Sequence, residues 1–382
     1  MEKGSFRLGC QRGAKCEESR KLSARYKKLH TKLAGETLYL AHHRPSLSAD
    51  SSDARGQKLS MTNATLRAAG QDDSQFGVGQ ARARAELAAG LARPQASIAP
   101  KYFYDTQGSK LFEAICALDE YYPTRSEREI FRLHGAAIAE AAGQGAALID
   151  LGAGNCEKAA SLFGSLRPRT YVPVDISTVF LQSAVAQLRQ TFPGLAIHPL
   201  GIDFSETLVL PAIIQAQPNK LFFYPGSSLG NFTPLQALRF LHNIREQDGD
   251  LLIGLDLVKD IAIIEAAYDD ALGVTAAFNL NSLRHANRIL NADFDLGDWS
   301  HQAFFNNAQS RIEMHLRARR ACRVTWPGGA RAFEPLETIH TENSYKFTKE
   351  SATDLLRRAG FVQIRSWTDP QQNFLVCHAR AA

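Results

Sequence analysis

The sequence predicts an α/β fold built on a doubly wound, Rossmann-like parallel sheet, with a second, smaller inserted α+β domain. Five apolar runs of strand length occupy residues 146–152, 170–177, 195–204, 221–226 and 250–258. Amphipathic segments of helical length lie between them, for example at residues 178–192 and 234–247. Strands that alternate with helices of this length are typical of a parallel sheet that is covered on both faces.

The regular alternation is interrupted between residues 258 and 346. This segment holds a helical pattern at 261–271, a predicted loop at 273–281 and strand-like runs at 310–326 and 336–347. We expect it to form the smaller domain together with residues 73–125. Residues 126–257 and 347–382 then form the sheet domain, which the runs at 362–369 and 373–381 can close as an antiparallel hairpin.

The chain before the first strand is predicted to be largely helical. Residues 75–93 are rich in Ala and Arg, and their second half is expected to be a helix. Another helix is predicted after Asp105–Gly108, with Leu111 and Ile115 on one face. A turn at residues 121–124 leads into a third helix, whose start is favoured by the Pro and the Thr-Arg-Ser-Glu stretch.

The basic charge of the chain is concentrated at its beginning. The formal net charge is +5, yet residues 1–60 alone hold thirteen Lys or Arg and six Asp or Glu. We therefore predict a basic, disordered extension over residues 1–72, with Met61 as a possible true start. The acidic residues within it argue against nucleic-acid binding. No apolar run approaches the roughly 20 residues that span a bilayer, and we expect a cytoplasmic protein.

The six cysteines give no sign of a disulfide framework or a metal centre. They are scattered, without a C-x-x-C pair or the spacing of metal ligands. Free, reduced thiols are the expected state for a cytoplasmic protein, and no metal is predicted. A nucleophilic role for Cys156, in a glycine-rich loop, lacks an identifiable base.

A glycine-rich turn follows the first predicted strand, in the segment Asp150-Leu-Gly152-Ala-Gly154. Glycine lets the backbone approach a ligand where a Cβ would clash. A dinucleotide site needs a third glycine and a helix start free for pyrophosphate, but Glu157 stands there. S-adenosylmethionine (SAM) carries no phosphate and a positive sulfonium, so it tolerates this acid. A lone G-x-G also occurs in purely structural turns.

Two later strands also end in residues suited to adenosine. Asp175 ends the second predicted strand, where a carboxylate can accept both ribose hydroxyls. Asp203 and Phe204 end the third, where an acid can accept from the adenine amino group and a ring can lie against the base. The carboxyl ends of parallel strands meet at one sheet edge, so adenosine binding is favoured.

The fourth predicted strand runs into Tyr224-Pro-Gly226-Ser-Ser-Leu-Gly230-Asn231-Phe232. An Asn amide offers both a donor and an acceptor. Asn231 can therefore hold an amino or carboxylate group beside the sulfonium. A plain turn with a capping Asn is the alternative.

Several longer motifs carry a family resemblance. APKYFYDTQGSKLFEAI, LDEYYPTRSE, LIDLGAGNCEK, FFYPGSSLGNFTP, DLVKD, AAYDDALGVTAAFNLN, RIEMHLRA and HTENSYKF occur in this order between about residue 98 and the C-terminus. The chain thereby resembles the ergothioneine-pathway L-histidine Nα-methyltransferases. The resemblance implies a class I SAM-dependent methyltransferase domain and a smaller substrate-binding domain, which together convert L-histidine through its mono- and dimethyl forms into hercynine.

The resemblance also implies roles for individual residues. Cofactor contacts are expected at Tyr104, Gly152, Lys158, Asp175, Asp203 and Phe204. Histidine contacts are expected at Tyr121, Asn231, Tyr268, Glu342 and Ser344, with Gly226, Phe278 and Met314 lining the site. Tyr104 and Asn231 are the candidate catalytic residues. In the glycine loop, Asn155-Cys156 departs from the small hydroxyl residues common in the family, which matters little where the backbone makes the contact.

These residue types suit histidine chemically. Neutral imidazole has one donor and one acceptor nitrogen. Glu342 can accept the ring N–H, while Ser344 or Tyr121 completes the pattern. Tyr268 and Asn231 can hold the carboxylate. The neutral α-amine is then expected to attack the methyl carbon directly, with Tyr104, Asn231 and water orienting its lone pair.

Three alternatives compete with this interpretation. A related enzyme for an indole amino acid is disfavoured by Glu342 and Met314, in whose places an apolar and a smaller residue would be expected. A nucleotide-binding oxidoreductase is disfavoured by Glu157 and the missing glycine. A non-catalytic adaptor would use the basic extension. We expect a monomer that binds a small molecule, with no nucleic-acid or membrane partner.

Overall fold

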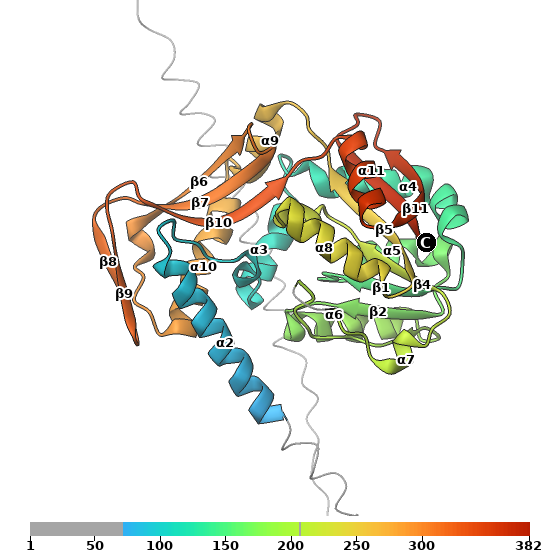
Figure 1. Ribbon diagram of the computed structural model, residues 1–382, viewed down its shortest axis with the longest axis horizontal. Coiled ribbons are helices and arrows are strands. Elements are labelled where there is room, and N and C mark those ends of the chain that lie inside the picture. Colours follow the sequence, from blue (N-terminus) through green and yellow to red (C-terminus); the bar gives the residue numbers. More distant parts are fainter. Residues whose placement is uncertain (1–71, 206–207) are drawn as a thin grey trace, which may run out of the picture. The chain divides into compact units, whose positions relative to one another are not determined.

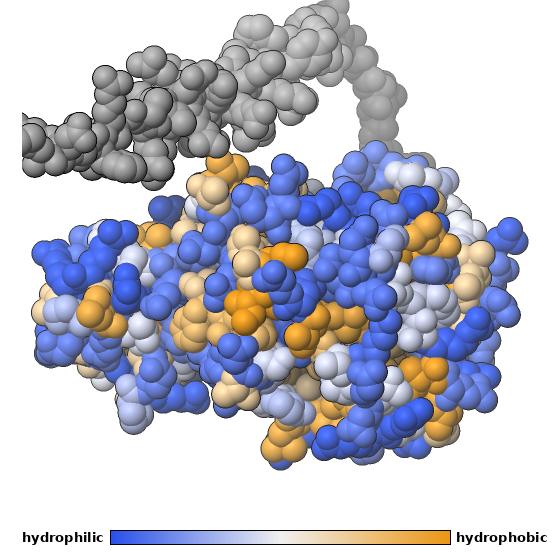
Figure 2. All heavy atoms as spheres, turned by 90° about the horizontal axis from the view of Figure 1, so that it is seen from above, coloured by the Kyte–Doolittle hydropathy of each residue, from blue (hydrophilic) through white to orange (hydrophobic). Residues whose placement is uncertain are grey.

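The computed structural model of the protein describes residues 72–205 and 208–382. The predicted basic extension, with Met61, lies outside the described residues except for Asp72, where helix α2 begins. The four cysteines of the described part are free and lie in buried or half-buried positions. None of the helices in this part is long and apolar enough to cross a membrane. On the face shown in Figure 2, polar residues predominate and apolar residues form separate small groups.

A seven-stranded sheet carries the larger part of the fold (Figure 1). Its strands, in the order β11-β12-β5-β4-β1-β2-β3, are β11 (Phe361–Thr368), β12 (Phe374–Ala381), β5 (Gly249–Asp256), β4 (Lys220–Tyr224), β1 (Ala147–Leu151), β2 (Thr170–Val174) and β3 (Ala196–Ile197). The strands from β5 to β3 are parallel, and β12 pairs antiparallel with both β5 and β11. The predicted α/β class, the parallel order and the closing hairpin are confirmed.

Helices cover both faces of this sheet because successive strand residues point to opposite sides. In β4, Leu221 and Phe223 pack in one core cluster and Phe222 and Tyr224 in the other. The first cluster contains α4 (Tyr122–Ala142), α5 (Glu157–Leu166) and α6 (Thr178–Thr191). The second contains α7 (Ala212–Gln215), α8 (Pro234–Arg245) and α11 (Lys349–Arg358). Apolar strand residues are therefore buried on both sides.

A second sheet has the order β10-β7-β6 and is antiparallel throughout. Its strands are β6 (Trp299–Asn306), β7 (Arg311–Ala318) and β10 (Thr338–Tyr345), and a hairpin of β8 (Cys322–Trp326) and β9 (Gly329–Phe333) adjoins it in the chain. The remaining helical elements are α2 (Asp72–Ala92), η1 (Pro100–Phe103), α3 (Thr106–Cys116), η2 (Ser228–Asn231), α9 (Ile261–Tyr268), α10 (Val274–Leu290) and η3 (Leu296–Asp298).

Residues before α4 pack against this second sheet. The Ile98 N–H donates to the His340 carbonyl (2.9 Å), and the His340 N–H donates to the Ala96 carbonyl (2.8 Å), so this segment borders β10. Leu87 and Leu91 of α2 share a core cluster with residues of α10 and β7. The division into two domains at the residues given above remains a prediction.

The predicted loop at residues 273–281 is wrong, because these residues begin the 17-residue helix α10. The Asp270 carboxylate accepts hydrogen bonds from the backbone N–H groups of Val274 (3.0 Å) and Thr275 (2.7 Å). Gly273, with φ of 72°, forms the N-cap. Asp270, three residues before the N-cap Gly273, was thus a start signal for helix α10.

Three other boundaries differ from the prediction. Helix α2 covers almost the whole of residues 75–93, and α4 already begins at Tyr122, inside the predicted turn. The third strand is only Ala196–Ile197, although the His198 and Leu200 N–H groups still donate to the Tyr171 and Pro173 carbonyls of β2 (2.9 Å each). Backbone pairing continues through an isolated bridge between Val174 and Leu200, and Asp203 lies in the loop beyond.

The close approach of η1 to α3 depends on Gly108. A Cβ built on Gly108 would lie 1.6 Å from the Phe103 carbonyl oxygen, whereas one on Gly135, in the middle of α4, meets nothing within 4 Å. We expect Gly108→Ala to lower the free energy of unfolding by at least about 2 kcal/mol through overpacking. Gly135→Ala should raise it by up to about 1 kcal/mol through helix propensity. Denaturant unfolding of both variants checks this, and equal shifts would contradict the described packing.

Candidate active site

Two cavities share part of their walls at the carboxyl edge of the seven-stranded sheet. The larger, of about 1110 Å³, is lined by all six predicted cofactor residues: Tyr104, Gly152, Lys158, Asp175, Asp203 and Phe204. The smaller, of about 50 Å³, is lined by all eight predicted substrate residues: Tyr121, Gly226, Asn231, Tyr268, Phe278, Met314, Glu342 and Ser344. Five of these residues line both: Tyr104, Tyr121, Gly226, Asn231 and Glu342. The structure thus brings the predicted residues together, while their roles remain predictions.

The glycine turn forms the floor of the larger cavity. Gly152 and Gly154 have positive φ angles of 76° and 54°, which favour glycine. The Gly152 N–H donates to the Val174 carbonyl (2.8 Å) and ties the turn to the end of β2. A Cβ on Gly152 would lie 3.8 Å from the Phe204 ring. The glycine thereby keeps the space beside this ring open.

Asp175 lies directly after β2, at the cavity wall. Its Oδ2 accepts from the Gly154 N–H (2.9 Å) and its Oδ1 from the Ser177 N–H (2.8 Å). These two bonds fix the plane of the carboxylate. Each oxygen keeps a further lone pair for a ligand hydroxyl, because a carboxylate oxygen can accept two hydrogen bonds.

Asp203 is held by a partner that the sequence did not reveal. Its Oδ2 forms an ion pair with Lys101 Nζ (3.0 Å), which also contacts Glu86 of α2 (2.8 Å). Ser205 donates to Oδ1 from its N–H and its hydroxyl. Burial by itself raises the pKa of Asp203, but the hydrogen bonds from Ser205 and Lys101 prevail and hold it below its usual value. Asp203 therefore stays ionised.

Asp150 was predicted to follow the first strand, but it lies inside that strand. It is the fourth residue of β1, almost fully buried, and its Oδ2 accepts from the Tyr171 hydroxyl (2.7 Å). Burial raises its pKa to about 7. Of the three acids predicted at strand ends, Asp175 follows its strand directly, Asp203 lies in a loop and Asp150 lies inside a strand.

Lys158 reaches the border of the cavities from α5. Its Nζ pairs with Glu127 Oε2 (2.6 Å), and Glu127 Oε1 accepts from the Gly226 N–H (2.8 Å). Glu127 is fully buried on α4. This carboxylate therefore fixes both the lysine and the loop after β4. Sequence reasoning placed Glu127 only on a helix, and no local pattern indicates such a long-range contact.

Aromatic side chains enclose the smaller cavity. Phe278 of α10 lies against Phe103 (4.7 Å between ring centroids), Tyr104 (5.6 Å) and Phe112 (6.0 Å). Tyr121 lies against Tyr268 (6.4 Å). These rings come from η1, α3, α9 and α10 and from two flanking residues, Tyr104 directly after η1 and Tyr121 directly before α4. Phe112 of α3, which was not among the predicted site residues, lines both cavities.

Polar groups project into this apolar enclosure. Among the described residues, the Tyr104 and Tyr121 hydroxyls, the Asn231 amide and the Glu342 carboxylate have no side-chain hydrogen bond. Burial raises the pKa of Tyr104 and of Tyr121 well above the usual value, so both hydroxyls stay protonated. A ligand with several donors and acceptors can satisfy these groups together.

Glu342 lies in the interior of β10 and is 8% exposed. Burial raises the pKa of its carboxyl group to about 8, although the nearby Lys346 opposes this shift. Lys346 itself is fully buried and contacts Tyr268 and Ser344. It was missed as a site residue, yet residues 342, 344 and 346 follow the period of two that places alternate strand residues on one face.

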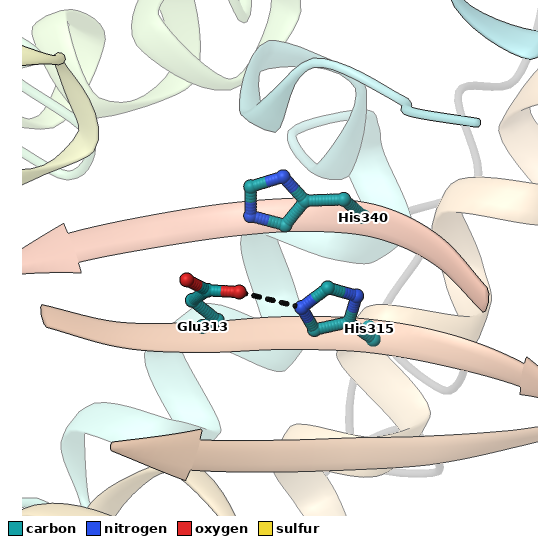
Figure 3. Close-up of side chains that lie close together, drawn as sticks. All are labelled: Glu313, His315 and His340. Carbon is teal, nitrogen blue, oxygen red and sulfur yellow. Dashed lines mark hydrogen bonds and ion pairs between the residues drawn. The ribbon is translucent and has the colours of Figure 1, made fainter. Parts of the chain in front are cut away.

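A second acid–histidine cluster lies on β7 and β10 (Figure 3), where Glu313, His315 and His340 bring possible ligand atoms within 4.8 Å. Glu313 Oε2 accepts from His315 Nε2 (2.9 Å), and its Oε1 accepts from Arg311. Although burial raises it, these hydrogen bonds lower the pKa of Glu313 to about 2. The two imidazole planes are stacked at 19°, so their in-plane lone pairs do not converge. These contacts favour an ion pair over a metal centre.

Several known proteins are similar in sequence to this chain over most of its length. A family model described as histidine-specific methyltransferase, SAM-dependent, matches residues 83–381. Proteins named histidine N-alpha-methyltransferase from Mycolicibacterium smegmatis and Mycobacterium tuberculosis are 42% and 40% identical, each over 76% of this chain and 92% of the relative. Ergothioneine biosynthesis protein 1 of Neurospora crassa is 32% identical over 69% of this chain and 31% of that protein.

The raised pKa of Glu342 predicts how pH affects the ligand-free protein. Its pKa rises from 4.5 to about 8 on folding. The stabilisation from proton binding is fully present below pH 4.5 and is lost as pH rises through 8. Between pH 6 and pH 9 the melting temperature should therefore fall by several °C more in the parent than in Glu342→Gln.

Glu140→Gln is the matched control, because the Glu140 side chain is 76% exposed and should leave the parental pH profile in place. A parental profile in Glu342→Gln as well would contradict the buried, protonated state of Glu342.

Proposed function

This chain belongs to the family of histidine-specific, SAM-dependent methyltransferases, and from that premise we propose that it methylates the α-amino group of free L-histidine. Three transfers give hercynine for ergothioneine biosynthesis. The seven-stranded sheet is that of a class I methyltransferase. The observation that carries the substrate assignment is a small aromatic cavity with unsatisfied polar groups that shares its wall with the larger cavity.

The residues of the larger cavity fit SAM. Asp175 has free lone pairs for the ribose hydroxyls, and the space beside Gly152 and Phe204 suits a flat base. Lys158 stands at the border of the cavities, where it can pair with the amino-acid carboxylate of SAM. When bound, SAM supplies the activated methyl group. The chain's own task is to hold histidine with its nitrogen in line.

The imidazole end of histidine is assigned to Glu342 and Ser344. The carboxylate of Glu342 accepts the ring N–H, and the Ser344 hydroxyl faces the other ring nitrogen. Both side chains line the smaller cavity, where water is largely excluded. Leaving such buried groups unpaired penalises a wrong side chain. The same acid and the bulk of Met314 disfavour an indole ring.

The amino-acid end is assigned to the wall between the cavities. Asn231 holds the carboxylate, and Tyr268 lies beside it with its hydroxyl bonded to Ser344 (2.8 Å). Asn231 with Tyr104 orients the amine lone pair. Because burial keeps the Tyr104 hydroxyl protonated, this residue acts through hydrogen bonding and not as a strong base. Protons released by the amine leave through water in the larger cavity.

A nicotinamide-dinucleotide oxidoreductase is disfavoured by the structure of the glycine loop. Glu157 is the first residue of α5, at the helix end where a pyrophosphate would have to bind. A carboxylate at this position repels a diphosphate.

We also place the enzyme in the cytoplasm as a monomer without nucleic-acid or membrane partners. The free cysteines of the described part and the small cavity, sized for a metabolite, support this assignment. Light scattering after size-exclusion chromatography tests the monomer.

The substrate assignment predicts a narrow specificity. Purified protein with labelled SAM should methylate L-histidine far faster than any of the other common amino acids. Glu342→Ala should lower kcat/KM for histidine by roughly 10²–10⁴-fold, because the ring N–H loses its acceptor. Glu342→Gln, whose amide carbonyl still accepts, should lose less.

S-adenosylhomocysteine affinity serves as the control and should stay at the parental value in both variants. Parental kcat/KM for histidine in Glu342→Ala would refute the assignment of the imidazole to this residue.

A further inference from the structure

The most deeply buried cation beside the smaller cavity is Lys346, which directly follows β10. Its side chain is 0% exposed and pairs with Asp256 Oδ2 (2.8 Å), at the end of β5. Burial lowers the pKa of Lys346, but the charge of Asp256 prevails and raises it above the usual value. The side chain is therefore an ammonium group at all physiological pH values. The roles proposed above for substrate residues do not use this charge.

All three N–H donors of Lys346 are engaged. One serves Asp256, one the Tyr268 hydroxyl (3.1 Å) and one the Ser344 hydroxyl (2.8 Å). An ammonium group cannot accept a hydrogen bond. Both hydroxyl oxygens must therefore accept from Lys346.

The two hydroxyls also bond to each other, with 2.8 Å between the Tyr268 and Ser344 oxygens. One hydroxyl donates in this contact, and the other then accepts twice and keeps its own proton free. One hydroxyl proton remains free whichever of the two hydroxyls donates. Neither oxygen has a further hydrogen bond to the described residues. The pair thus presents a donor to the cavity.

Glu342 lies on the same face of the strand and provides a hydrogen-bond acceptor. Its carboxylate lines the same cavity and, once ionised, only accepts hydrogen bonds. A neutral imidazole matches this arrangement, with its N–H toward Glu342 and its bare nitrogen toward the hydroxyl pair. A ring with two donors or without an acceptor leaves a buried group unsatisfied.

We propose that Lys346 is a positioning residue for substrate selection, because it occupies a lone pair on each hydroxyl of the Tyr268–Ser344 pair, strengthens the pair as a donor and thereby favours a ring with an acceptor nitrogen. This inference rests on the proposed function and adds to it the reason why the hydroxyl pair acts mainly as a donor. A hydroxyl that accepts from a cation is a stronger donor and a weaker acceptor. Without the ammonium group, each of the two oxygens regains a lone pair, so the pair donates less strongly and accepts more readily.

Lys259 provides a matched control for the loss of the positive charge of Lys346. Lys259 Nζ binds the same carboxylate, through Asp256 Oδ1 (2.5 Å), and contacts the Tyr122 hydroxyl (2.8 Å). It has no hydrogen bond to Tyr268 or Ser344. Replacing either lysine with Met removes one positive charge from Asp256, but only Lys346→Met frees the hydroxyl pair.

The test compares ring analogues of histidine bound to protein loaded with S-adenosylhomocysteine. Calorimetry gives Kd for 3-(thiazol-4-yl)alanine and 3-(thiazol-5-yl)alanine, which place one acceptor nitrogen at either ring position, and for 3-(2-thienyl)alanine, which has none. In the parent, the better thiazolyl isomer should bind roughly three-fold to ten-fold more tightly than the thienyl analogue, the effect of one hydrogen bond. This preference should fall to about two-fold or less in Lys346→Met and stay at the parental value in Lys259→Met.

The double variant Lys346→Met/Asp256→Asn removes both buried charges and tests the same preference if the single variant does not fold. A parental preference in either Lys346 variant that folds, or an equal loss in Lys259→Met, overturns the inference. Failure of the proposed function is distinguishable, since it appears as absent histidine methylation in the parent. A parent that methylates histidine but shows no thiazolyl preference overturns only the role of Lys346.

Discussion

The buried ion pair between Asp256 and Lys346 joins the two sheets next to the smaller cavity. Asp256 ends β5 of the seven-stranded sheet, and Lys346 directly follows β10 of the second sheet. The backbone is joined at the same place, because the Phe347 N–H donates to the Asp256 carbonyl (2.9 Å). A charge pair in the interior stabilises only when hydrogen bonds satisfy its remaining groups. Here Tyr122 and Lys259 donate further hydrogen bonds to the Asp256 carboxylate. Tyr268 and Ser344 accept the remaining hydrogen bonds of the Lys346 ammonium group.

The site follows from this junction. Lys346 fixes the hydroxyls of Tyr268 and Ser344 by hydrogen bonds. The polar atoms of Glu342, Asn231 and Tyr104 remain available for a ligand. A second buried carboxylate, Glu127, plays a comparable part at the larger cavity by fixing Lys158 and Gly226. Low exposure makes each unsatisfied group costly, so the ligand must match them all. Selectivity and alignment thus have the same physical origin.

Such an arrangement suits methyl transfer, in which the protein mainly aligns its reactants. Tyrosines whose pKa is raised by burial orient groups through hydrogen bonds and do not act as bases. The Glu342 carboxyl, with a pKa of about 8, can instead exchange a proton when an imidazole arrives. In the proposed binding mode, this exchange occurs at the imidazole end of histidine, away from the nitrogen that is methylated.

The sequence by itself determined the parallel sheet and its closing hairpin, because strand period and turn signals are local patterns, and its long motifs indicated some of the residues that line each cavity. Where a start signal was overlooked, as at Asp270 and Gly273, residues 273–281 were wrongly taken as a loop. Only the tertiary structure decided that Lys101 pairs with Asp203, that Glu127 holds Lys158 and that Lys346 bonds to Asp256. These partners are 31–102 residues apart in the chain, and a local pattern carries no information about which distant charge will share a buried space.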